Sequence, residues 1–313
     1  MIINPYFLKK KAREILKTNL QTALLISFFA SLLYTILNLY MSTHLPNPAE
    51  YLPFADYLGY TKALQLVSKN TWTTLFTLEL LYFMFTPVLT ISANYYFICR
   101  TKGEELGVMG IFSRSKNILR ALALFILIIV KVFLWSLCFI VPGIIAIINY
   151  SMAPYFLAED PTISPWQAIE KSKACMKKRK LFYVVVMLSF IVLQMAALVL
   201  QNFTLVFGVI ISLVISQAVS LLITTYKQVT ETIFFRMLSD TEYQKNMQTE
   251  MTSELQDMGV DVNSIEEKIK EIEEEIEEEI DEEVEKEKEE EKEENKTENK
   301  DTNNTTGSAK DNE

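Results

Sequence analysis

Residues 119–158 read LRALALFILIIVKVFLWSLCFIVPGIIAIINYSMAPYFLA, and Arg120 and Lys131 are their only charged residues. An α-helix rises 1.5 Å per residue, so about 20 apolar residues cross a hydrocarbon core of about 30 Å. The stretch is long enough for two crossings, and Pro142 and Gly143 interrupt it where a helix can break. It predicts a hairpin of two membrane spans, 119–141 and 144–158, that turns at Pro142 and Gly143.

Apolar runs on both sides of this stretch extend the pattern. Before the first of them, residues 1–19 combine five basic side chains with an apolar stripe, as is typical of an amphipathic helix at a membrane surface. The predicted fold is an all-α, polytopic membrane helical bundle of six spans, at about residues 20–41, 72–98, 119–141, 144–158, 181–201 and 206–226.

The fourth span is short, because its 15 residues reach only about 22 Å, so Pro142 and Gly143 could instead mark a kink inside one long helix. The basic residues favour the hairpin. Six spans place 5, 5, 6 and 3 Lys or Arg residues on one side, in residues 1–19, 99–120, 159–180 and 227–260, and leave only Lys62 and Lys69 on the other. Basic loops stay cytoplasmic, so both termini are predicted to lie in the cytoplasm and the chain in the plasma membrane.

The acidic residues are concentrated at the C-terminal end. Residues 261–313 hold 24 acidic and 8 basic residues, whereas residues 1–260 hold 15 acidic and 22 basic residues, a net charge of +7. After a linker at 236–260, residues 261–294 carry Ile at three- and four-residue spacing among glutamates, which predicts an acidic helix or weak coiled coil. Residues 295–313 are predicted to be disordered.

Lys131 lies about ten residues into its span, near the predicted centre of the bilayer, where an isolated charge is costly. Glu79 in the second span reaches a similar depth, so the two residues are a candidate intramembrane pair. Such a pair could be a structural clamp, a proton relay or an anion site. Lys131 could also extend its ammonium toward the membrane surface without any partner.

Five residues are candidate span breaks, because Pro, Gly and Asn disturb a regular helix or add polar groups at membrane depth: Pro87, Pro142, Gly143, Asn149 and Pro154. Broken helices line many transporter sites, but such residues are also tolerated as kinks and as interhelical hydrogen-bonding groups.

A basic helix is predicted after the fourth span. Ser164, Pro165 and Gln167 form a capping-box pattern that starts this helix. Trp166, Ile169 and Met176 would then lie near one face, as expected for a helix at an anionic membrane surface. Its lysines are the candidate contacts with anionic lipid headgroups: Lys171, Lys177, Lys178 and Lys180.

No enzyme, cofactor or metal motif is present in the sequence. The single histidine and three unclustered cysteines form neither a zinc-site nor a disulfide pattern, and no nucleophile elbow, HExxH or Walker sequence occurs. Catalysis, cofactors and metals are therefore not expected, and no nucleic-acid motif accompanies the basic loops.

Several stretches resemble a known family. They are residues 11–19 (KAREILKTN), 134–137 (LWSL), 140–145 (IVPGII), 150–155 (YSMAPY) and the segment from Ser164 to Met176. The order is similar to that of the bacterial integral membrane proteins called domain of unknown function 975, over about residues 5–235. The resemblance implies a six-span bundle and no assigned activity. The family's Gly-Pro in span two is Thr86-Pro87 here, and its Asp-Asn-Pro after span four is Glu159-Asp160-Pro161, so roles tied to that Gly or Asn do not carry over.

A more distant similarity, around Pro142–Gly143 and Ser164–Ser172, is to membrane domains attached to some glycerophosphodiester phosphodiesterases, and it implies a lipid-proximal accessory role. The expected function is a non-enzymatic membrane module that binds lipids or a membrane or cytoplasmic protein, with the basic interfacial helix and the acidic tail as contact surfaces. The alternative is a small-solute transporter or channel component that uses Glu79 and Lys131.

Overall fold

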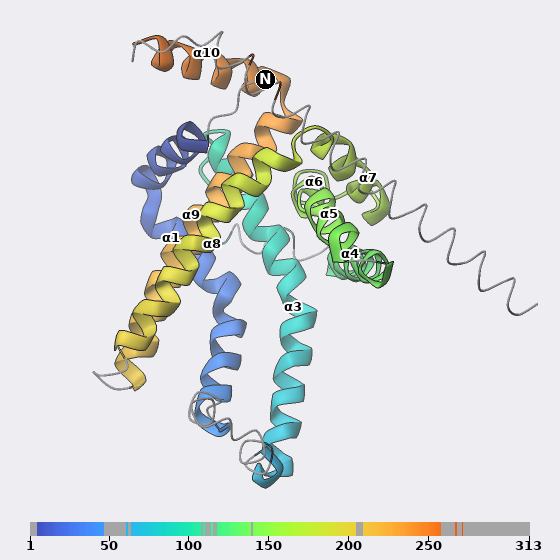
Figure 1. Cartoon of the computed structure of the whole chain (residues 1–313), viewed down its shortest axis with the longest axis vertical. Helices are drawn as coiled ribbons and strands as arrows, with labels where there is room; N and C mark the ends of the chain where they lie inside the picture. Colours follow the sequence, from blue (N-terminus) through green and yellow to red (C-terminus); the bar gives the residue numbers. More distant parts are fainter. Residues whose placement is uncertain are drawn as a thin grey trace, which may run out of the picture. The chain divides into compact units, whose positions relative to one another are not determined.

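The computed structural model describes residues 5–46, 61, 64–107, 109, 114, 118–138, 140–204, 209–257, 267 and 271. The chain divides into two compact units, one of residues 3–249 and the other of residues 1–2 and 250–313. The regular elements of the described residues are all helices, which confirms the predicted all-α fold (Figure 1).

The longest helices are α1 (Pro5–His44), α3 (Lys69–Thr101), α4 (Ile118–Cys138), α8 (Lys180–Thr204) and α9 (Val209–Ser239). Shorter helices are α5 (Ile140–Tyr150), α6 (Ala153–Glu159), α7 (Pro165–Met176) and α10 (Thr241–Asp257). Within the larger unit, α1 packs against both α3 and α9, and α8 runs beside α9 (Figure 1).

Local capping explains where α3 begins and ends. The Ser68 hydroxyl accepts the N–H of Thr71 at 3.2 Å, which satisfies one of the unpaired donors of the first turn. At the other end Gly103 adopts φ +83°, and the N–H of Glu104 returns to the Cys99 carbonyl at 3.0 Å. A left-handed glycine of this kind stops a helix, because it turns the chain while pairing the last carbonyls.

Five segments are long and apolar enough to cross a membrane: Leu20–His44, Lys69–Thr101, Ile118–Leu137, Ile140–Glu159 and Lys180–Leu200. They coincide with the first five predicted spans and are consistent with a membrane protein. The sixth predicted span, 206–226, overlaps α9, so the count of six stays a prediction.

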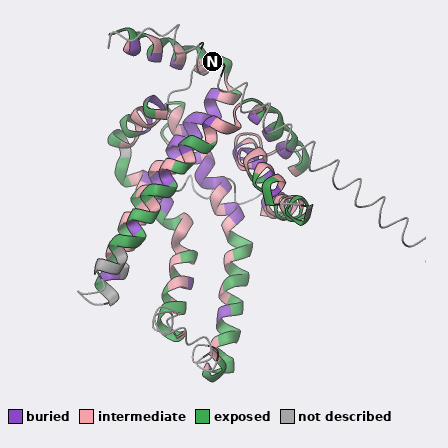
Figure 2. Cartoon of the chain, in the orientation of Figure 1, coloured by how far each residue is buried: buried purple, intermediate pink, exposed green. Residues whose placement is uncertain are grey.

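Burial is uneven along α3 and shows where the protein core lies. Between Pro87 and Cys99 most of its side chains are buried, whereas its first half buries only Leu75 (Figure 2). That first half exposes large apolar side chains, namely Trp72, Phe76, Leu80, Leu81, Phe83, Met84 and Phe85. A soluble monomer rarely exposes so large an apolar surface, which fits contact with lipid.

The predicted hairpin is present, but its turn is not at Pro142 and Gly143. Helix α4 ends at Cys138, α5 begins at Ile140, and both predicted breakers lie inside the first turn of α5. A proline is tolerated there because the first N–H groups of a helix have no intrahelical partner. The prediction placed the turn about three residues too late.

Gly143 has a packing role in the hairpin. A Cβ built on this buried glycine overlaps the Ser136 hydroxyl and lies 3.1 Å from the Ser136 Cα. Residues seven apart in one straight helix are separated by about 10 Å, so this contact shows that the chain reverses direction. The absence of a side chain at Gly143 allows α5 to lie directly against α4.

We predict that Gly143→Ala lowers the free energy of unfolding by about 1–3 kcal/mol, because the added methyl group forces the two helices apart. The measurement is thermal unfolding of the full chain in detergent, followed by tryptophan fluorescence. Gly107→Ala is the matched control, since a Cβ at Gly107 meets no atom within 4 Å. Equal midpoints for the two variants would contradict the packing role.

The two loops predicted to share a side do meet. The Lys102 ammonium lies 2.7 Å from the Glu159 carboxylate, and Arg114 donates to the Glu159 carbonyl at 3.2 Å. Arg120 donates to the Pro161 carbonyl. Lys102, Arg114 and Arg120 therefore lie at the same end of the larger unit as Glu159 and Pro161, as the hairpin requires and a single kinked helix would not allow.

Other predicted boundaries shift. Residues 5–19 form a continuous helix with the first span, and Phe7, Leu8 and Ala12 are buried in it. Most of the predicted linker, 236–260, is helical, in the end of α9 and in α10. The predicted acidic helix or coiled coil at 261–294, apart from residues 267 and 271, and the predicted disordered tail at 295–313 lie outside the described residues.

Candidate functional site

A break between α5 and α6 lies at the centre of the candidate site. Helix α5 ends at Tyr150 and α6 begins at Ala153, so two of the predicted break residues, Asn149 and Pro154, flank the interruption. Pro154 occupies the first turn of α6, where its missing N–H costs nothing.

The Ser172 side chain of α7 closes this break. Its hydroxyl donates to the Asn149 carbonyl at 2.7 Å and accepts the Met152 N–H at 3.2 Å. Ser172 is fully buried, as is Met152. A backbone group freed from a helix and buried away from water costs free energy unless it is paired, and this single hydroxyl pairs one donor and one acceptor.

We predict that Ser172→Ala destabilises the chain by about 1–3 kcal/mol, because both backbone groups lose their partner. Thermal unfolding of the full chain in detergent measures the change. Ser42→Ala is the control, since the Ser42 hydroxyl is exposed and only donates to the Leu39 carbonyl one turn earlier. If Ser172→Ala matched the control, the hydroxyl bridge would not hold the break.

Pro87 is different from Pro154, because it does not end its helix. It is buried inside α3, which is one continuous helix of 33 residues. The prediction that the span breaks at Pro87 is therefore wrong, because the helix continues through this residue. Neighbouring helices can compensate for the hydrogen bond that a proline removes, and α3 has α1 and α9 beside it.

A partly buried carboxylate that the sequence analysis did not identify lies next to the break. Glu231 of α9 accepts hydrogen bonds from two phenols, Tyr155 of α6 and Tyr183 of α8, each at 3.1 Å and each to a different carboxylate oxygen. The Lys227 ammonium is 3.8 Å from one of these oxygens. We call these four residues the Glu231 cluster.

Aromatic packing encloses the Glu231 cluster. The Tyr155 ring stacks on Phe235 at a centroid distance of 5.4 Å, and the Tyr183 ring stacks on Phe234 at 5.7 Å. A charge withdrawn from much of the solvent is stabilised by hydrogen bonds, and here both carboxylate oxygens accept one. The arrangement joins α6, α8 and α9. Sequence pattern could not reveal it, because Glu231 is a lone acidic residue whose partners lie 48 and 76 positions away.

We predict that Tyr155→Phe lowers the free energy of unfolding by about 1–3 kcal/mol, because one oxygen of a partly buried carboxylate loses its phenol donor. Tyr34→Phe, at a half-exposed ring, is the matched control. The same substitution repeated in a Glu231→Gln background should cost less if the two groups are coupled. An unchanged cost in that background would show that the phenol acts through packing alone.

The structure does not bring Lys131 and Glu79 together. The Lys131 ammonium lies 3.6 Å from the Trp166 ring centroid and 5.7 Å from that of Tyr150. The Trp166 Nε1–H donates to the Glu170 carboxylate. Glu79 is exposed on α3, and it enters none of the ion pairs found among the described residues.

The reason is the position of α7. The pairing was expected because Lys131 and Glu79 have similar depths along their own spans. Depth alone does not reveal that a later helix, α7, packs back on α4. Trp166 thereby offers its ring face to Lys131, and a cation over an aromatic face is stabilised without a formal counter-ion. The carboxylate of Glu170 at the edge of the same ring adds to this stabilisation.

The capping box predicted for α7 is confirmed. The Gln167 N–H donates to the Ser164 hydroxyl at 3.2 Å, and the Gln167 side chain accepts the Ser164 N–H at 2.9 Å. Ile169 and Met176 are buried as the apolar face predicted, but Trp166 is half-exposed above Lys131. Ala168 and Ser172 complete the buried face.

The lysines of α7 lie on the opposite face. Lys171, Lys173 and Lys177 are exposed, and none of them enters an ion pair with a described residue. Lys178 is exposed at φ +63°, in the tight turn that leads to α8, whose first residue is Lys180. We call the exposed lysines Lys171, Lys173, Lys177 and Lys178 the lysine surface.

Cys175 lies beside this surface but is not a nucleophile. Burial raises the pKa of its thiol to about 12, so the thiol stays protonated at neutral pH. Within the described part of the chain no group of three His, Cys, Asp or Glu side chains could hold a metal ion. The expectation that the chain is not an enzyme rests on the sequence alone.

Comparison with known proteins gives one match. Residues 139–242 match a family model described as "Protein of unknown function (DUF975)". No curated protein and no solved structure matches the chain. The matched region contains the break, Ser172, the Glu231 cluster and the lysine surface, and excludes Glu79 and Lys131. It confirms the resemblance for this part of the chain.

Proposed function

Because the family model that matches residues 139–242 is described without an activity, we propose a function from the structure of that region. The chain is a non-enzymatic, multi-pass protein of the plasma membrane, with both termini in the cytoplasm. It binds anionic lipid headgroups through the lysine surface.

The observation that supports this proposal is the fixed orientation of α7. Ala168, Ile169, Ser172 and Met176 bury one face of the helix, and the capping box fixes its first turn. The opposite face then presents exposed lysines directly before α8, which starts a candidate membrane span at Lys180. Lysines at this position lie at headgroup level whenever α8 crosses a bilayer.

The basic loop between α3 and α4 offers less to a lipid headgroup. Three of its basic side chains already make contacts within the protein: Lys102 pairs with Glu159, Arg114 lies over the Tyr95 ring at 3.9 Å, and Arg120 donates to the Pro161 carbonyl. Lys171, Lys173 and Lys177, in contrast, enter no ion pair with a described residue. Each available lysine near an anionic surface contributes about 1 kcal/mol.

The transport alternative receives no support from the described residues, because its two proposed site residues are apart. A protein partner that binds the acidic tail remains a second proposal. It rests on the charge of residues 261–313 alone.

We expect the double substitution Lys171→Glu and Lys177→Glu to weaken binding of phosphatidylglycerol at least about tenfold, because two favourable charges become repulsive. The measurement titrates a fluorescent phosphatidylglycerol onto the full chain in detergent at low and high salt. Affinity of the unmodified chain should fall as salt rises, since surface charges are screened.

The matched control is the double substitution Lys69→Glu and Lys245→Glu, which makes the same change in net charge at exposed positions outside the lysine surface. Both double variants must elute as the unmodified chain does on size exclusion. Equal loss of affinity in the two would mean that net charge, and not this surface, attracts the lipid. Binding that is insensitive to salt would also contradict the proposal.

A further inference from the structure

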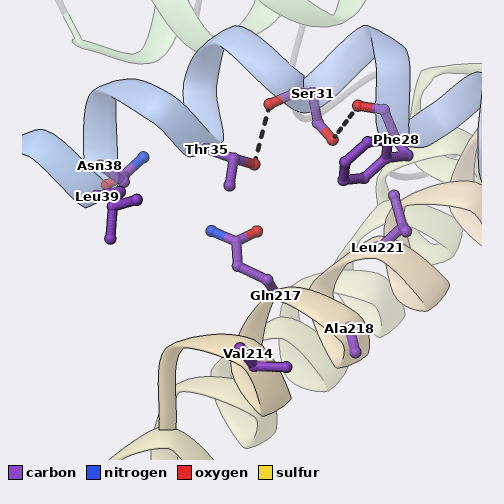
Figure 3. Close-up of a pocket in the computed structure, with 9 residues that line it drawn as sticks. All are labelled: Phe28, Ser31, Thr35, Asn38, Leu39, Val214, Gln217, Ala218 and Leu221. Carbon is purple, nitrogen blue, oxygen red and sulfur yellow. Dashed lines mark hydrogen bonds between the residues drawn. The ribbon is translucent and has the colours of Figure 1, made fainter. Parts of the chain in front are cut away.

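A cavity of about 400 Å³ lies between α1 and α9, away from the lysine surface and the Glu231 cluster. Figure 3 shows the two helices facing each other across it. The side chains that line the cavity are Phe28, Ser31, Thr35, Asn38 and Leu39 from α1 and Val214, Gln217, Ala218 and Leu221 from α9. None of them is charged.

The polar groups of α1 are satisfied within their own helix. Ser31 donates to the Phe28 carbonyl at 3.2 Å, Thr35 to the Ser31 carbonyl at 3.1 Å, and the Asn38 amide to the Tyr34 carbonyl at 2.9 Å. Such bonds let polar side chains reside in an apolar medium. These three residues therefore do not require a ligand.

Gln217 is the exception. Its side chain extends from α9 into the cavity toward Thr35 and Asn38 (Figure 3), and within the described residues its amide makes no hydrogen bond. It lies eight residues after Val209, about 12 Å along the helix, inside the predicted sixth span. An amide without a hydrogen-bond partner in hydrocarbon costs free energy. A bound molecule that offers a donor or an acceptor to Gln217 would remove this cost.

We propose that this cavity binds an uncharged lipid of the diacylglycerol class, whose hydroxyl or ester carbonyl pairs with the Gln217 amide and whose acyl chain lies along Phe28, Leu39 and Leu221. The volume is in the range of small-molecule sites. It equals roughly a single turn of a helix 10 Å across, too little for a partner helix to enter. A phospholipid phosphate would find no cationic side chain in the lining.

The site uses none of the residues of the lysine surface. It concerns the uncharged part of a lipid, whereas the proposed function concerns anionic headgroups. Each proposal can therefore fail without the other.

The test uses the full chain in phosphatidylcholine nanodiscs and a diacylglycerol that carries a photoreactive diazirine on its acyl chain. After irradiation, mass spectrometry of peptides locates the adducts. We expect adducts on residues 28–39 and 214–221, and we expect excess unlabelled diacylglycerol to reduce them at least fivefold. Substitution of Lys171 and Lys177 by Glu should leave this labelling unchanged.

Two variants test the assignment of residues. Ala218→Trp fills the cavity and should reduce labelling about tenfold, whereas Val192→Trp adds the same bulk at an exposed position of α8 and should not. Gln217→Leu keeps the size but removes the polar partner, and it too should reduce labelling about tenfold. Gln194→Leu is its matched control, because the Gln194 amide already donates to the Ser220 hydroxyl at 3.2 Å.

Three results would overturn the proposal. The first is unchanged labelling in both Ala218→Trp and Gln217→Leu. The second is equal labelling of these residues by a phosphatidylcholine probe, which would identify ordinary boundary lipid. The third is a crosslink from this cavity to a second protein chain, which would make it an interface.

Discussion

The rest of the described site depends on one hydroxyl, that of Ser172. A chain that interrupts a helix inside a protein core must pair the backbone groups that it frees, because no water is available to do so. Ser172 pairs the Asn149 carbonyl and the Met152 N–H from a neighbouring helix. The same contact holds α7 against the break. It thereby fixes which face of α7 is buried and which carries the lysines.

The break separates α5 from α6, and Tyr155 of α6 reaches Glu231. Without an interruption, the segment from Ile140 to Glu159 would be one regular helix. With it, a phenol from α6 and another from α8 meet a carboxylate of α9. Three segments far apart in the chain are joined by one partly buried carboxylate. Charge-assisted hydrogen bonds of this kind are strong, but they also require that every partner be present, which couples the integrity of the three helices.

The basic residues serve two separate purposes that composition alone does not distinguish. Lys102, Arg114 and Arg120 hydrogen-bond to the loop around Glu159 and Pro161, and Lys102 also forms an ion pair with the Glu159 carboxylate. The lysines of α7 lie on an exposed face beside a candidate span. Lys131, which sequence alone would pair with a carboxylate at membrane depth, instead lies over Trp166. A cation–aromatic contact makes a formal counter-ion unnecessary.

The sequence by itself determined the helical class, five of the membrane-length segments, the existence of the α4–α5 hairpin, the capping box of α7 and the resemblance of residues 139–242 to a family model. These follow from apolar length, charge asymmetry and short motifs, which are local properties of the chain. Only the tertiary structure decided the turn position beside Gly143, the partner of Lys131, the Glu231 cluster and the cavity at Gln217. Each of these depends on which helices pack together, and contacts between residues far apart in sequence leave no periodic signal along the chain.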